Sequence, residues 1–294
     1  MTKNKSNKNK PMLSVVLATR NEEENIKRCL ESVSDIADEI IVVDEHSTDK
    51  TVERAKSHGA KVFLEPHHNI FHITKQKALD KASGEWILQL DADEVVTAKL
   101  GREILAVVNK IPPKVNNSRK AKLFKRHQEL IQQRDGAIGT ESGEVVGYFL
   151  PRANMFLGKP LIHAGVYPDG VIRLVKNGYA KFPQLSVHEQ IKLDGKVGWL
   201  ENDLLHYDSP TLTRYFARMN RYTDLKAQEL KKDKTRKNIW SFLIYTVYKP
   251  IYTFVILYFR HKGVLDGVAG FLWSFFSALH FPVGYWKYMT SKYN

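Results

Sequence analysis

The chain has 294 residues, of which 43% are hydrophobic and 26% are charged. This length can bury a sizeable core without disulfide or metal staples, and the composition excludes a largely disordered chain. The single cysteine, Cys29, excludes an internal disulfide, a cysteine-rich zinc site and an iron–sulfur cluster, and it is compatible with a reducing, cytoplasmic compartment.

The net charge of +13 is distributed unevenly along the chain. Residues 11–109 contain 12 basic and 18 acidic side chains, whereas residues 110–134 contain eight basic side chains and one acidic side chain. Because the first hundred folded residues are acidic overall, we do not expect one continuous basic surface that could follow the phosphates of a nucleic acid. We therefore expect no nucleic-acid partner. The basic segments suit a catalytic body held against an anionic membrane surface.

The first half of the chain alternates between two patterns. Residues 1–10 are polar and basic and lack the apolar core of a signal peptide, so we expect a disordered tail there. Between residues 11 and 109, β-branched runs predict strands at 13–19, 39–44, 60–65 and 85–93, and helical periodicity predicts helices at 22–33, 50–58 and 74–82. This alternation predicts an α/β fold with a mostly parallel sheet flanked by helices.

Polar clusters follow three of the expected strands: Thr19-Arg20-Asn21-Glu22, Asp44-Glu45-His46-Ser47 and Asp91-Ala92-Asp93-Glu94. Ligands of parallel sheets bind outside the carboxyl ends of the strands, so we expect the clusters to converge on one crevice. Two carboxylates spaced like Asp91 and Asp93 can grip a divalent cation, Mg²⁺ or Mn²⁺, together with diphosphate oxygens. The alternative is a solvated turn.

Simpler interpretations exist for some of these residues. Asp44 could accept a hydrogen bond from a base or ribose, whereas Ser47 is also explained as a cap of the next helix. Glu22 suits the start of a helix, where acidic side chains are favourable. Histidines 67, 68 and 72 lack a carboxylate or cysteine frame, which favours surface or loop histidines over a metal site.

The remainder of the chain changes character several times. Residues 110–144 form a basic insert, expected to be a helix or a mobile loop. Residues 145–210 predict short antiparallel strands, and residues 211–238 contain an amphipathic helix with Tyr215, Phe216, Met219, Tyr222 and Leu225 on one side.

Residues 239–294 are apolar and are expected to be membrane-associated helices. The two long apolar stretches, 239–259 and 264–286, favour helices that lie in one leaflet, over a transmembrane hairpin or buried core helices. Lys249-Pro250 argues against a span, because a central lysine is costly in a bilayer. Gly267, Gly270, Ser274 and Ser277 form a stripe that suits close helix contact.

Several segments together resemble a known family. In the N-terminal half, LSVVLATRNEEENIKRCLESV, DEIIVVDEHSTDKTVERAKSHGAKVF and KALDKASGEWILQLDADEVVT resemble family 2 glycosyltransferases with the GT-A fold. Further on, LPRANMFLGKPLIHAGVYPDGVIRLVKNG and SVHEQIKLDGKVGWLENDLLHY resemble the subgroup that includes lipopolysaccharide-core glucosyltransferases.

The resemblance implies a nucleotide-diphosphate-sugar donor, most often UDP-linked. It places Asp44 on the base, Lys75 on the nucleotide or its phosphates, Asp91 on the ribose side and Asp93 on the metal. The strand-end residues complete the expected nucleotide-sugar site: Thr19, Arg20, Asn21, Glu22 and Ser47. The sequence departs from the family pattern at Arg20, where an aromatic is common, at Thr74-Lys75-Gln76 and in the basic insert.

Direct displacement at a sugar's anomeric carbon needs a general base close to the acceptor hydroxyl. The candidate is Glu189 of the Val-His-Glu motif, with a solvated strand-end glutamate as the alternative. Asp169 is the second candidate, although Pro-Asp-Gly is also a turn sequence. His188 could ligate the metal or be structural, and His163, Arg173 and His206 complete a polar rim.

The sequence therefore predicts an inverting, metal-dependent glycosyltransferase at the inner face of the cell membrane, acting on a lipid-linked or cell-envelope glycan acceptor. A nucleotidyltransferase is the alternative enzyme, although the usual Gly-rich loop after the first strand is missing. A non-catalytic membrane- or nucleic-acid-binding protein on a sugar-nucleotide fold is the third. The sequence contains no P-loop, no G-x-G-x-x-G motif and no G-x-S-x-G elbow.

Overall fold

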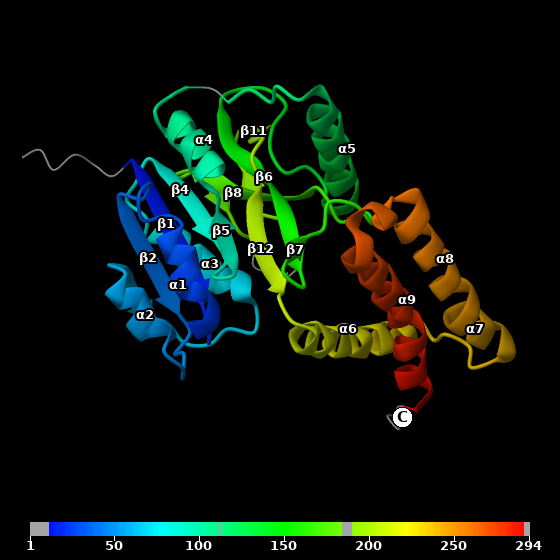
Figure 1. Cartoon of the computed structure of the whole chain (residues 1–294). Coiled ribbons are helices and arrows are strands. Elements are labelled where there is room, and N and C mark those ends of the chain that lie inside the picture. Colours follow the sequence, from blue (N-terminus) through cyan, green and yellow to red (C-terminus); the bar gives the residue numbers. More distant parts are fainter. Residues whose placement is uncertain (1–11, 112, 184–189, 291–294) are drawn as a thin grey trace, which may run out of the picture. The chain divides into compact units, whose positions relative to one another are not determined.

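The computed structural model describes residues 12–111, 113–183 and 190–290 (Figure 1). It divides into two compact units. Unit 1 comprises residues 1–152 and 170–206, and unit 2 comprises residues 153–169 and 207–294. The six segments expected from the sequence divide the chain more finely, and their boundaries stay predictions.

Unit 1 is built on a mixed sheet with the strand order β3-β2-β1-β4-β8-β6-β12-β5. Strands β3, β2, β1 and β4 run parallel, whereas β8 is antiparallel to β4 and β12 is antiparallel to β5. The bounds are β1 Leu13–Thr19, β2 Glu39–Asp44, β3 Lys61–Leu64, β4 Trp86–Leu90, β5 Glu94–Val96, β6 Val145–Phe156, β8 Asp169–Lys176 and β12 Leu204–Ser209. The last residues of β6 and β12 and the first residue of β8 belong to unit 2.

Four further strands are short. They are β7 Lys159–Pro160, β9 Ala180–Lys181, β10 Lys192–Leu193 and β11 Lys196–Trp199. Strands β9 and β10 form a separate antiparallel pair. Strand β11 runs parallel to β6, so the expectation of antiparallel strands in this region is wrong for that pair.

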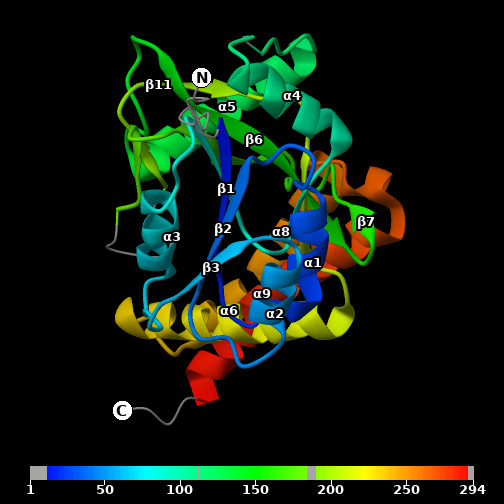
Figure 2. The same cartoon turned by 90° about the vertical axis from the view of Figure 1, so that its left-hand side faces the viewer.

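Helices cover both faces of the parallel strands. Figure 2 shows α3 on one side of β1 and β2, and α1 and α2 on the other. All of β1 is buried: Val15 and Leu17 share an apolar cluster with Ile26, whereas Val16 shares a second cluster with Ala78. Because side chains alternate along a strand, a strand buried on both faces needs a helix layer on each. The helices are α1 Glu23–Glu31, α2 Thr51–Ser57, α3 Phe71–Asp80 and α4 Ala98–Val108. The predicted α/β class is confirmed.

The strand expected at residues 85–93 ends earlier than predicted. β4 stops at Leu90, and a tight turn leads into β5. The backbone N–H of Glu94 donates to the carbonyl of Asp91 (3.0 Å), and the N–H of Asp91 donates to the Glu94 carboxylate (3.0 Å). These two bonds close the turn that carries both aspartates, and periodicity alone does not reveal them.

The basic insert contains a helix, α5 Ser118–Asp135. The side chain of Asn117 caps it by accepting from the N–H groups of Arg119 and Lys120. Phe124, on its buried face, stacks on Trp199 with ring centroids 4.4 Å apart, and Trp199 also stacks on Phe149 at 4.6 Å. Of the two expectations for the insert, helix or mobile loop, the helix is confirmed.

Unit 2 is mainly helical. Its elements are α6 Leu212–Lys232, α7 Ile239–Leu243, the π-helix η1 Ile244–Tyr248, α8 Lys249–Val255, the π-helix η2 Ile256–Arg260, the 3₁₀ turn η3 Gly263–Asp266 and α9 Gly267–Thr290. In a regular α-helix, the ring of Pro250 would clash with the carbonyl of Thr246, four residues earlier. Thr246 lies in the π turn η1, where the backbone departs from α-helical geometry. Two helical runs, Ile239–Arg260 and Gly263–Thr290, are long and apolar enough to cross a membrane.

The small-residue stripe and the amphipathic helix are each confirmed in part. Gly270 and Ser274 are buried, and a Cβ on Gly270 would clash with the carbonyl of Gly263, so a glycine is needed for this close approach. Gly267 instead has φ +60 and serves a turn. On α6, Tyr215 and Met219 are buried, whereas Phe216, Tyr222 and Leu225 are exposed.

Candidate active site

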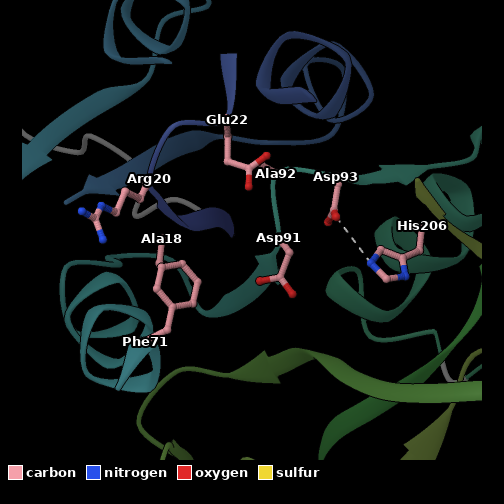
Figure 3. A pocket seen from close by; sticks show the side chains of 8 residues that line it. All are labelled: Ala18, Arg20, Glu22, Phe71, Asp91, Ala92, Asp93 and His206. Atoms are coloured by element: carbon pink, nitrogen blue, oxygen red, sulfur yellow. Dashed lines mark ion pairs between the residues drawn. The ribbon is translucent and has the colours of Figure 1, made fainter. Parts of the chain in front are cut away.

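A cavity of about 310 Å³ lies at the carboxyl ends of β1 and β4 (Figure 3). In the parallel register Thr19 pairs with Asp44 and Leu17 with Leu90, so the loops that follow these strands leave the sheet at one edge. The first and third strand-end clusters therefore converge, as the sequence predicts. The cavity is lined by Ala18, Arg20, Glu22, Phe71, Asp91, Ala92, Asp93 and His206.

Asp93 and His206 face each other in this cavity (Figure 3). Asp93 Oδ2 lies 3.6 Å from Nε2 of His206, and their side chains are 17% and 15% exposed. Strand β12 places His206 there, because its pairing with β5 sets His206 opposite Glu94. A carboxylate oxygen and an imidazole nitrogen at this separation can both reach one divalent cation, since each metal bond is about 2.0–2.2 Å long.

The carboxylate of Asp91 lies between two cations. Its Oδ1 is 2.6 Å from Nζ of Lys75, and its Oδ2 is 2.5 Å from Nη2 of Arg173. Burial raises the pKa of Asp91, but Arg173 and Lys75 outweigh this effect and hold that pKa well below its ordinary value. Burial lowers the pKa of Lys75, which Asp91 partly opposes. Asp91 is thus a charged anchor with both oxygens engaged.

Arg173 connects Asp91 to a second, fully buried carboxylate. Its Nη2 lies 2.7 Å from Oε1 of Glu94, whose side chain is 0% exposed, and its Nη1 donates to Oε1 of Gln89 (2.5 Å). Burial lowers the pKa of Arg173, but Asp91 and Glu94 raise it overall. Arg152 also lies within 3.4 Å of Glu94. This network fixes the floor of the cavity.

Asp44 is fully buried and does not line the cavity. Its carboxylate accepts from Thr19 Oγ1 (2.8 Å), Ser47 N (2.7 Å) and Ser47 Oγ (2.6 Å). Ser47 Oγ accepts in turn from the N–H of Asn21 (2.8 Å). These bonds join the loop after β1 to the loop after β2.

Arg20 and Phe71 line the opposite side of the cavity from Asp93 and His206 (Figure 3). Arg20 Nη1 contacts the ring of His67 at 3.0 Å. The Lys75 ammonium lies 5.6 Å from the centre of the Phe71 ring, within cation–π range. The site therefore has an acidic end, a buried basic floor and an aromatic wall.

Residues 14–129 match the model of glycosyl transferase family 2. The chain contains a family 2 glycosyltransferase domain. The enzyme is 28% identical over 267 residues to the lipopolysaccharide core biosynthesis glycosyltransferase LpsC of Rhizobium meliloti, covering 88% of this chain and 85% of the relative. It is 45% identical over 92 residues to an uncharacterized glycosyltransferase of Rickettsia bellii, covering 31% of each chain.

Solved structures similar to the glycosyltransferase include a mannosyltransferase from Pyrobaculum calidifontis in complex with GDP-Man and Mn²⁺. The TM-score is 0.47 at 13% identity, covering 97% of this chain and 89% of that one. Another is glucosyl-3-phosphoglycerate synthase from Mycobacterium tuberculosis in complex with uridine diphosphate, with a TM-score of 0.26 at 33% identity, covering 28% and 33% of the two chains.

Five of the residues predicted for the site line the cavity, namely Arg20, Glu22, Asp91, Asp93 and His206, and Lys75 is bonded to Asp91. Thr19, Asn21, Asp44 and Ser47 support the loops around it. Asp169 belongs to unit 2, where its Oδ2 accepts from Nδ2 of Asn154 (3.0 Å). The predicted base Glu189 and possible metal ligand His188 lie outside the described residues.

The sequence did not identify Gln89, Arg152 and Phe71 as parts of the candidate site, and it placed Glu94 there only as the last member of a strand-end cluster. Glu94 directly follows the two aspartates, but its burial comes from strand β5, which the sequence did not predict. Gln89, in contrast, is a polar residue inside an apolar strand, and that pattern is a usable signal. The expectation of surface or loop histidines is wrong for His72, which is 8% exposed and lies against Phe182.

Proposed function

We propose that this glycosyltransferase transfers a sugar from a UDP-sugar donor to a lipid-linked or cell-envelope glycan acceptor, with inversion at the anomeric carbon and with Mg²⁺ or Mn²⁺ as cofactor. The supporting observation is the pairing of Asp93 with His206 in a cavity at the carboxyl ends of β1 and β4. In sheets of this kind, that edge is where nucleotides bind.

The donor set in the cavity fits a divalent cation. Asp93 and His206 would hold it. Within residues 12–111, 113–183 and 190–290, no cluster of three or more acidic, histidine or cysteine side chains is arranged to bind a metal ion, so the protein would supply two ligands. The remaining coordination positions are then left for diphosphate oxygens and water. When bound, the cation would neutralise charge on the departing diphosphate.

The chain's own residues have separate tasks in this proposal. Lys75, bonded to Asp91 of the cavity lining, would offer its ammonium group to the donor phosphates, with Asp91 holding its position. The aromatic ring of Phe71 would exclude water beside that charge. Glu189 would take the proton from the acceptor hydroxyl, with Asp169 as the second candidate.

The acceptor part of the proposal rests on the apolar runs of unit 2 and on the resemblance to lipopolysaccharide-core enzymes. Two helices able to enter a lipid phase would hold the enzyme beside a lipid-borne acceptor at the inner face of the cell membrane. The named relative LpsC is an enzyme of lipopolysaccharide core biosynthesis. Both observations favour an envelope glycan.

The test is a screen of nucleotide sugars for release of the nucleoside diphosphate by the full chain, with Mn²⁺, with Mg²⁺ and with EDTA. We expect turnover of a UDP-sugar that EDTA abolishes. Asp93→Asn should lose about 10²-fold or more of this activity, whereas Asp35→Asn, an exposed carboxylate outside the cavity, should not. Full turnover by Asp93→Asn, or turnover in EDTA, would overturn the metal-dependent mechanism.

A further inference from the structure

Exposed apolar side chains are concentrated in the last helices of unit 2. Among the described residues, eighteen of the thirty exposed large hydrophobic side chains lie between residues 239 and 290. They include Trp240, Ile251, Val268 and Trp286, which are 60–76% exposed. An apolar surface of this density on a helical pair needs a partner.

One end of this helical pair is bonded to a polar loop of the same unit. His163 Nδ1 lies 2.7 Å from Oδ1 of Asp266, and the N–H of His163 donates to Oδ2 of Asp266 (2.8 Å). The N–H of Ala164 donates to the carbonyl of His261 (2.8 Å). The connection between the two helical runs is therefore held against the loop that precedes β8.

The other end of α9 is bonded to α6 and to the residues that follow it. Nζ of Lys287 lies 2.7 Å from Oδ1 of Asp224, and the hydroxyl of Tyr288 donates to the carbonyl of Thr235 (2.6 Å). Between these ends, α6 packs along α9 from Tyr215, which contacts Trp273, to Leu230, which packs against Tyr285. Helix α6 contains eight charged residues, so it cannot follow α9 into hydrocarbon at low cost.

These attachments leave too little of α9 to span a bilayer. His261 and Asp266 are bonded to the loop, and residues from 273 to 288 are packed on α6. The free part, residues 267–272, is roughly 9 Å long at 1.5 Å per residue, against a hydrocarbon core of about 30 Å. The attachments therefore argue against a transmembrane hairpin.

The first helical run is also unsuited to a span. Lys249 lies at its middle, with Nζ 3.9 Å from the ring centre of Tyr245 and 5.7 Å from that of Phe281 on α9. Contacts of η1, α8 and η2 with α9 keep residues 244–260 of this run beside α9 (Figure 1). At a membrane surface, these two aromatic rings stabilise the ammonium group of Lys249 through cation–π contacts, and its aliphatic stem allows the ammonium group to reach the lipid headgroups.

We infer that residues 239–290 form a monotopic membrane surface, whose exposed apolar side chains enter one leaflet of an anionic bilayer while both ends of α9 stay on the cytoplasmic side. Arg260 and Lys262, which are exposed at the connection between the runs, supply attraction to anionic headgroups. The inference deepens the membrane part of the proposed function and rests on it.

Labelling with a membrane-impermeant maleimide tests the orientation in the full chain. Arg260→Cys marks the connection between the runs, and Arg102→Cys, exposed on α4 of unit 1, marks the cytoplasmic side. The unaltered chain is the blank, because Cys29 is 0% exposed. We expect both variants to react in inverted membrane vesicles and neither in intact spheroplasts. Reaction of Arg260→Cys in spheroplasts would overturn the inference in favour of a transmembrane hairpin.

Flotation with vesicles tests the lipid partner. The full chain should float with phosphatidylglycerol-containing vesicles and several-fold less with phosphatidylcholine alone. Val268→Asp should reduce flotation several-fold, whereas Leu64→Asp, an equally apolar exposed site on β3, should not. A chain that ignores vesicles and is dimeric without detergent would show that a second copy covers this face, and would overturn the inference. Neither assay depends on turnover, so failure of the proposed reaction stays distinguishable.

Discussion

The guanidinium of Arg173 lies 2.5 Å from the carboxylate of Asp91, although the two residues are 82 positions apart. Nζ of Lys75 lies 2.6 Å from the other carboxylate oxygen, so each oxygen of Asp91 is paired with a side-chain cation. Asp93, two residues further on, faces the cavity and His206 instead. Two aspartates from one short motif therefore have different environments, and we expect different roles for them.

Substitution of each aspartate should separate these roles. Asp93→Asn should weaken binding of Mn²⁺ in the presence of UDP by about tenfold or more, because a ligand oxygen loses its charge. Asp91→Asn should leave Mn²⁺ affinity within a few fold and weaken donor binding, because Lys75 loses its anchor. Calorimetric titration with Mn²⁺ and with UDP measures both quantities. Equal loss of Mn²⁺ affinity in the two variants would contradict separate roles.

Removal of Arg173 should destabilise unit 1. Arg173→Met leaves the buried Glu94 without its closest cation, and breaking a buried ion pair from one side costs about 3–5 kcal/mol of unfolding free energy. Arg173→Lys should lose less, because it keeps the charge but not the forked geometry. Urea denaturation followed by circular dichroism gives the values, with exposed Arg102→Met as the control. An unchanged midpoint for Arg173→Met would show that the network is not structural.

The two candidate bases can be compared directly. Glu189→Gln should keep donor affinity and lower the transfer rate by roughly 10²- to 10⁴-fold, because a general base contributes about that much. Asp169→Asn should have a much smaller effect, since its carboxylate is bonded to Asn154 in unit 2. Steady-state kinetics with saturating donor separates kcat from KM. A large loss in Asp169→Asn alone would transfer the role to that residue.

Glu39 should contribute to the acid sensitivity of folding. Burial raises its pKa, but hydrogen bonds from Ser14 and Ser83 and the nearby Lys61 ammonium lower it from the ordinary 4.5 to about 2. A carboxyl with a lowered folded-state pKa stabilises the protein above its unfolded-state pKa. That contribution is lost as the pH falls from about 4.5 toward 2.

The measurement is the free energy of unfolding at pH 7 and at pH 3 for the wild type and for Glu39→Gln. The wild type should lose about 1–2 kcal/mol more than the variant between the two values, because the variant has no charge at this site to neutralise. Glu53→Gln, on the exposed side of α2, serves as a matched control. Parallel pH dependence in all three proteins would remove Glu39 from this role.

Local patterns explain the success of the predictions in the first hundred residues. Runs such as LSVVLAT are apolar at every position, which is typical of a strand covered on both faces, and helical periods separate them. The convergence of the clusters after β1 and β4 follows from parallel pairing alone. The position of the candidate site at this edge of the sheet is therefore predictable from the sequence.

Predictions were weaker where distant segments meet. Trp199 stacks between Phe124 and Phe149, and this contact holds the basic insert as a helix, a choice the insert's own sequence left open. Strand β5 is three residues long and exists through its pairing with β12. Periodicity cannot detect such a strand, because its partner is about 110 residues away.

The α/β class, the edge of the sheet with the candidate site and the two aspartates of the cavity follow from local patterns, because strand periodicity and strand-end position are local properties. The folded arrangement, in contrast, is needed to see that Asp91 is anchored by Lys75 and Arg173 while Asp93 faces His206. The charge environment of a carboxylate depends on groups brought close by folding, and in this chain His206 reaches the cavity from β12, more than a hundred residues beyond Asp93.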